Sequence, residues 1–165
     1  MRKTVQNSRV RPPAERKESS VSATEENRTF RVVVPGGRQP DKVRIDAPPF
    51  VSRLKSRCDY AIEVFADKPK KAFFFVELKG EDVHKAIKQL AYTIEHLADY
   101  RDLLDYRQFA VRHACIVASR GPQPAITMGY QKCKAKIERC GFAKVVCRTH
   151  QLTARVATNG EVRYE

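Results

Sequence analysis

Glu77 and Lys79 follow an apolar run, and their types and spacing suit chemistry on a phosphate group. The residues before Glu77 read AFFFV, and a glycine closes the segment at position 80. Aromatic and β-branched content of this kind predicts a buried strand over residues 72–80. Side chains two residues apart on a strand share a face, so Glu77 and Lys79 should stand together while Leu78 points to the other face. A carboxylate can hold a hard cation, and an adjacent ammonium can orient a water or a phosphate.

Asp59 offers a second carboxylate upstream of this segment. Residues 57–65 read RCDYAIEVF, which predicts another strand with Asp59 at its start. Residues 67–71 read DKPKK and have the composition of a turn, so the two strands are expected to form an antiparallel hairpin. In such a hairpin, Asp59 and Glu77 lie side by side near one end of the sheet.

A helix should follow the second strand, because apolar residues after position 82 recur at spacings of three and four. Gln89 lies on the flank of this helix, where a side chain can reach the edge of the sheet. The set formed by Asp59, Glu77-x-Lys79 and Gln89 resembles the PD-(D/E)XK nuclease superfamily, which includes restriction endonucleases and Holliday-junction resolvases. The resemblance covers residues 42–100.

The resemblance implies a metal-dependent nuclease that acts on nucleic acid, with DNA as the expected substrate. In that mechanism Asp59, Glu77 and the Leu78 carbonyl hold Mg²⁺, for which Mn²⁺ can substitute. Lys79 orients or deprotonates the attacking water and stabilises the developing charge. Gln89 positions the water or a phosphate.

Two positions depart from the pattern of the superfamily. Cys58 stands where many members have proline, and residues 29–58 contain no glutamate, although many members carry an acidic residue on a helix before the motif. An alternative function therefore stays open. The chain could be a catalytically silent module with the nuclease fold that binds nucleic acid or protein as a subunit of a larger complex.

The net charge of the chain also indicates a polyanionic partner. The chain has 32 Lys and Arg against 19 Asp and Glu, a net charge of +13. Residues 1–28 contain seven basic and four acidic residues, so +10 of this charge belongs to residues 29–165. A basic surface on the folded part is typical of nucleic-acid binding. The candidates for phosphate contacts are Arg53, Lys55 and Arg57, just before Asp59, and Lys132, Lys134, Lys136 and Arg139 in a second basic segment.

The pattern along the chain predicts one domain after a disordered arm. Residues 1–28 are polar and show no periodicity, which is typical of disorder, and residues 29–165 should form the domain. Predicted strands alternate there with helices over residues 81–104 and 130–140. This order predicts an α/β fold with a mixed central sheet flanked by helices, as in the superfamily that the chain resembles.

The cysteines and the hydropathy pattern predict the compartment. Five cysteines without a Cys-x-x-Cys pair are expected to be reduced thiols, as in intracellular proteins. No apolar run has the length of a membrane span, so a cytoplasmic protein without a membrane partner is expected. A homodimer stays open alongside the larger complex.

Overall fold

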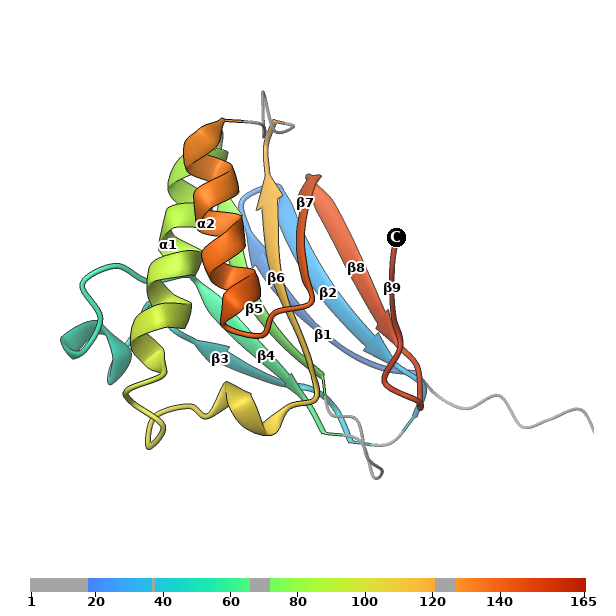
Figure 1. Ribbon diagram of the computed structural model, residues 1–165. Coiled ribbons are helices and arrows are strands. Elements are labelled where there is room, and N and C mark those ends of the chain that lie inside the picture. Colours follow the sequence, from blue (N-terminus) through green and yellow to red (C-terminus); the bar gives the residue numbers. More distant parts are fainter. Residues whose placement is uncertain (1–17, 37, 66–71, 121–126) are drawn as a thin grey trace, which may run out of the picture.

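The computed structural model describes residues 18–36, 38–65, 72–120 and 127–165. Two mixed β-sheets and two α-helices form three layers in an α/β arrangement (Figure 1). The predicted turn at residues 67–71 lies outside the described residues.

The larger sheet, called here the helix-bearing sheet, has five strands in the order β3-β4-β5-β6-β7. These strands are β3 (Asp41–Arg44), β4 (Tyr60–Val64), β5 (Ala72–Lys79), β6 (Val111–Ala118) and β7 (Lys144–Thr149). The first three form an antiparallel meander, and β5, β6 and β7 run parallel. The predicted antiparallel pairing of the Asp59 strand with the Glu77 strand is confirmed, with Tyr60 opposite Val76.

Two helices provide the crossovers between the parallel strands. Helix α1 (Val83–Leu97) follows β5, and the Asp82 side chain caps it by accepting a hydrogen bond of 2.8 Å from the Lys85 N–H. Helix α2 (Met128–Arg139) follows β6 and is capped in the same way by Thr127. Parallel strands joined by helices direct their carboxyl ends, and the amino ends of the following helices, to one edge of the sheet.

The second sheet has four strands in the order β1-β2-β8-β9. They are β1 (Ser19–Glu25), β2 (Arg28–Val34), β8 (Gln151–Val156) and β9 (Val162–Tyr164). Strands β8 and β9 are antiparallel neighbours, and the segment that joins them contains Asn159-Gly160, a pair typical of hairpin turns. Short 3₁₀ turns at Phe50–Ser52 and Tyr106–Gln108 complete the fold.

The alternation of side chains along β5 explains the three layers. Phe73 and Phe75 pack into the core shared with the helices, whereas Phe74, Val76 and Leu78 pack into the core shared with the second sheet. Both faces of β5 are therefore buried, as its apolar sequence predicts. Glu77 follows Phe75 by two positions, so its side chain lies on the same face of β5, the helix side.

Three expectations need correction. A single sheet with helices on both faces is wrong, because both helices pack on one face and the second sheet covers the other. The expectation of a disordered arm over residues 1–28 is wrong for residues 19–25, which form β1 and pair with β2, whereas residues 1–17 lie outside the described residues. Helix α1 ends at Leu97, earlier than the predicted end near residue 104. None of the helices among the described residues is long and apolar enough to cross a membrane.

Candidate functional site

Asp59 lies immediately before β4 and is held against β5 by its backbone and its side chain. Its N–H donates a hydrogen bond of 3.2 Å to the Val76 carbonyl. Its Oδ2 accepts a hydrogen bond of 2.7 Å from the Leu78 N–H. The Asp59 carboxylate is thereby fixed beside the residue that separates Glu77 from Lys79.

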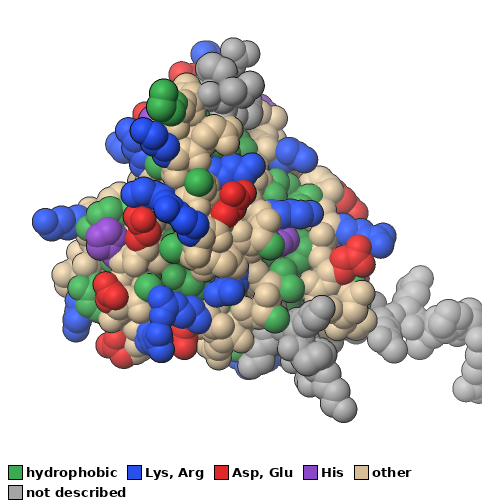
Figure 2. Space-filling model, viewed as in Figure 1, with side chains coloured by type: hydrophobic (Ala, Val, Ile, Leu, Met, Phe, Trp, Pro, Cys, Tyr) green, Lys and Arg blue, Asp and Glu red, His purple; other side chains and the backbone are tan. Residues whose placement is uncertain are grey.

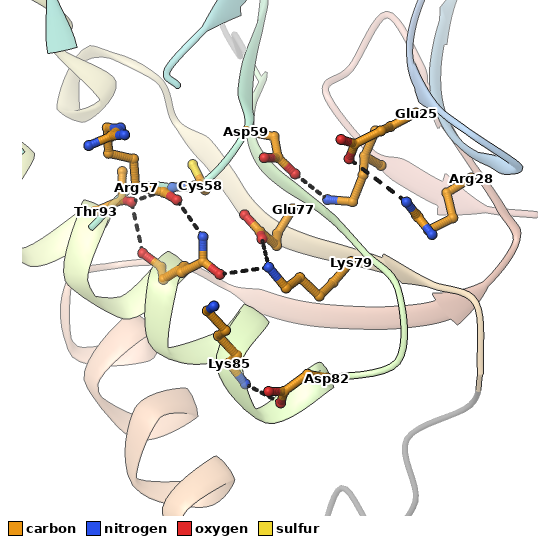
Figure 3. A network of polar contacts seen from close by, with 12 residues as sticks. Glu25, Arg28, Arg57, Cys58, Asp59, Glu77, Lys79, Asp82, Lys85 and Thr93 are labelled. Carbon is orange, nitrogen blue, oxygen red and sulfur yellow. Dashed lines mark hydrogen bonds and ion pairs between the residues drawn. The ribbon is translucent and has the colours of Figure 1, made fainter. Parts of the chain in front are cut away.

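Glu77 and Lys79 lie next to this carboxylate, and the three side chains point toward one another (Figure 3). The Glu77 side chain is 1% exposed, and its Oε1 lies 3.9 Å from the Lys79 Nζ. Its Oε2 is buried without a hydrogen-bond partner among the described residues. We call Asp59, Glu77 and Lys79 the carboxylate site.

The carboxylate site is electrostatically unfavourable for two negative charges. Burial, together with the charge of Asp59, raises the pKa of Glu77 to about 9, although the Lys79 ammonium opposes the shift. Burial also raises the pKa of Asp59 above its ordinary value, and the hydrogen bond from Leu78 opposes that shift. A proton or a cation is therefore needed at this site near neutral pH.

Gln89 reaches the site from α1, as the sequence predicts, but both ends of its amide are engaged by the protein. Its Oε1 accepts a hydrogen bond of 3.3 Å from the Lys79 Nζ, and its Nε2 donates one of 2.8 Å to the Arg57 carbonyl. The geometry makes Gln89 a link between Lys79 and the chain that leads to Asp59, rather than a side chain free to bind a water.

Thr93, one turn further along α1, strengthens the same link and was not among the predicted residues. Its side chain is fully buried, and its hydroxyl accepts a hydrogen bond of 2.8 Å from the Cys58 N–H. The same hydroxyl donates to the Gln89 carbonyl at 2.8 Å. The residue directly before Asp59 is thus anchored to the helix.

The oxygen atoms of the carboxylate site fit a hard cation such as Mg²⁺ in their chemistry. Carboxylate oxygens are ligands that Mg²⁺ prefers, and the unpartnered Glu77 Oε2 beside Asp59 is an oxygen that a cation could satisfy. Within the described part of the chain, no group of three or more His, Cys, Asp or Glu side chains could hold a metal ion. A site of two carboxylates still fits Mg²⁺, since this ion keeps several of its waters in proteins.

Glu25, at the end of β1, is a further acidic residue whose charge acts on the site. It contributes to the raised pKa values of both Asp59 and Glu77. Its side chain is half exposed and lies 3.9 Å from the Arg28 guanidinium. Sequence reasoning missed Glu25 because it falls in the segment that was expected to be disordered.

An open cleft of about 430 Å³ adjoins the site on the flank of α1. Its lining is entirely polar or charged and includes Asp59 and Gln89. The remaining lining residues are Asp46, Lys55, Ser56, Arg57, Lys85 and Lys88. Lys55 and Arg57 were predicted for phosphate binding, whereas Lys85 and Lys88 were missed. The spacing of Lys85, four positions before Gln89 on the helix, was a usable signal.

The other predicted phosphate contacts do not line this cleft. Arg53 lies over the Tyr100 ring, 5.3 Å from its centroid. The basic residues of α2 do not line the cleft, and Lys134 and Lys136 form ion pairs with Glu138 and Glu95. On the face seen in Figure 2, Lys and Arg side chains are dispersed rather than gathered in one patch.

Comparisons with known proteins identify no relative of this chain. No protein-family model matches the chain, and neither a curated protein nor a solved structure does.

Proposed function

We propose that the chain is a metal-dependent phosphodiesterase that cleaves nucleic acid, with DNA as the expected substrate and the carboxylate site as its catalytic centre. The observation that carries the proposal is the convergence of Asp59, Glu77 and Lys79 beside a basic cleft. The order of these residues, on two antiparallel strands and followed by a helix that carries Gln89, is the order on which the resemblance to the PD-(D/E)XK nucleases rests.

The burial of Glu77 supports a role in cation binding. A buried carboxylate with a raised pKa and an unpartnered oxygen costs folding free energy, so its presence needs a compensating function. Asp59 and Glu77 would hold the ion, which supplies charge neutralisation of the phosphate and a lowered pKa of a bound water. The resemblance adds the Leu78 carbonyl to this set.

The remaining residues have roles that follow from their contacts. The Lys79 ammonium stands beside Glu77, where it can orient a water and stabilise negative charge that develops on the phosphate. Gln89 holds that ammonium in place through its Oε1. The basic side chains of the cleft, Lys55, Lys85 and Lys88, would bind phosphates next to the scissile bond.

The experiment is a cleavage assay with purified protein and a panel of labelled DNA and RNA substrates, single-stranded, duplex and branched. Each substrate is incubated with Mg²⁺, with Mn²⁺ and with EDTA. The proposal expects products with either metal and none with EDTA. A protein that cuts none of the substrates with either metal would overturn it.

A second candidate function is a binding module that uses the same cleft without cleavage. One observation favours it: the described residues contain no cluster of three ligating side chains. On this account the protein binds the panel with equal affinity in Mg²⁺ and in EDTA and leaves every substrate intact. The cleavage assay therefore separates the two candidates.

A further inference from the structure

We infer that the exposed face of α1 beside the cleft binds an unpaired nucleic-acid strand, with Lys85 and Lys88 on its phosphates and the Tyr92–His96 ring pair as a stacking platform for its bases. The inference rests on the proposed function and specifies the form of its substrate. It is carried by the positions, charges and ring geometry of these four side chains.

The four residues lie on one face of the helix, because they are separated by three and four positions. Lys85, Lys88 and His96 are exposed and Tyr92 is half-buried. The opposite face of α1 packs into the core. From Lys85 to His96 the helix rises roughly 16 Å, enough to contact several nucleotides of one strand.

Charge complementarity marks the first half of this face as a place for phosphates. The ammonium groups of Lys85 and Lys88 form no ion pair with any described residue, and Lys55 faces the same cleft. Two lysines of α2 differ, since Lys134 and Lys136 have carboxylate partners within 4 Å. Unpaired ammonium groups around one cleft are the arrangement that gains most from a polyanion.

The ring pair marks the second half as a place for bases. The Tyr92 and His96 rings stack with centroids 3.8 Å apart and planes 13° apart. A hydrogen bond of 2.9 Å between His96 Nδ1 and the Tyr92 carbonyl fixes the imidazole.

Stacking on side chains requires bases whose faces are open, and a duplex hides them inside its own stack. The combination of unpaired lysines and a ring pair on one helix face therefore fits a single strand, or the unpaired part of a branched substrate, better than a continuous duplex. The cleft has the volume of a small-ligand site, which also suits one strand.

The test is equilibrium binding in EDTA, measured by fluorescence anisotropy with a labelled 12-nucleotide strand and the corresponding duplex, as DNA and as RNA. We expect tighter binding of the single strand. His96→Ala and Tyr92→Ala should weaken single-strand binding at least about fivefold, the scale of one lost base stack, and leave duplex binding unchanged. Tyr92→Phe keeps the ring and should bind like wild type.

Lys85→Ala and Lys88→Ala should each weaken binding of both substrates and reduce the salt dependence by about one phosphate contact. Lys144→Ala, at the exposed start of β7, is the matched control and should have little effect. Circular dichroism of each variant checks that the fold is intact.

The inference is overturned if the single strand binds no tighter than the duplex, if neither ring variant weakens its binding, or if no binding is detected. Cleavage in Mg²⁺, assayed separately, distinguishes this failure from that of the proposed function. If the protein cuts DNA but neither Tyr92→Ala nor His96→Ala weakens single-strand binding, the inference alone is contradicted. A protein that binds the strand through the rings but never cuts contradicts only the nuclease proposal.

Discussion

The Asp59 carboxylate accepts a hydrogen bond of 2.7 Å from the Leu78 N–H. This bond joins the residue that precedes β4 to the backbone of β5. This bond fixes Asp59 beside Glu77 and Lys79, whose side chains lie on the helix side of the same sheet. Burial and the neighbouring Asp59 charge raise the pKa of Glu77, and this shift leads to the first two predictions.

Glu77→Gln should stabilise the protein at alkaline pH in the absence of metal. The native carboxyl keeps its proton up to about pH 9, whereas the unfolded one releases it near pH 4.5. Between these values the native state binds more protons, so stability falls as pH rises. Urea unfolding at pH 5 and pH 8 should show that the stability of the variant rises relative to wild type, by on the order of 4 kcal/mol over this interval. An equal difference at both pH values would contradict the raised pKa.

Binding of a divalent cation at the carboxylate site should release a proton. Glu77 carries a proton at pH 7 because of its raised pKa, and the ion must displace it. Calorimetric titration with Mn²⁺ at pH 7, in two buffers of different ionisation enthalpy, should give about one proton released per ion. Affinity should therefore rise with pH.

Matched variants assign this proton to the site. Glu77→Gln should weaken Mn²⁺ binding and remove the proton release. Glu63→Gln changes another glutamate that lies further along β4, and it should bind Mn²⁺ like wild type. Buffer-independent heats in the wild-type protein would be incompatible with a protonated Glu77.

Thr93→Val should lower stability and impair catalysis because it removes the hydroxyl that anchors Cys58. The Cys58 N–H would then be buried without a partner, at a cost of about 1–3 kcal/mol in the free energy of unfolding. Thr93→Ser keeps the hydroxyl and should retain the cleavage rate of wild type. Urea unfolding and single-turnover cleavage measure the two effects. A valine variant as stable as wild type would show that the anchor is unimportant.

The strands that carry the carboxylate site could be predicted because their apolar runs and the charged residues at their ends are local features of the sequence. The AFFFV run identifies β5 as buried on both faces, and its charged end points to a site. The same run could not reveal that the layer against Phe74 is a second sheet, because burial against a helix and against a sheet produces the same sequence. Strand β1 escaped prediction because its sequence, SSVSATE, has only one fully buried residue, Ala23.

The candidate site was predicted only in part, because some of its contacts join segments that are distant in the sequence. Gln89 could be placed on the correct flank from helical periodicity, yet its bond to the Arg57 carbonyl joins segments 32 positions apart. Glu25 approaches the site only because β1 pairs with β2. Such contacts leave no local pattern in the sequence.

The central claim is that Lys79 acts with two metal-binding carboxylates on a phosphodiester, and single-turnover cleavage by Lys79→Ala tests it most directly. The rate in Mg²⁺ should fall at least ~10²-fold, the usual scale for losing a charge-stabilising group, while DNA affinity in EDTA changes little. Lys144→Ala, the matched control, should cut like wild type. Equal rates for wild type and Lys79→Ala would contradict the account.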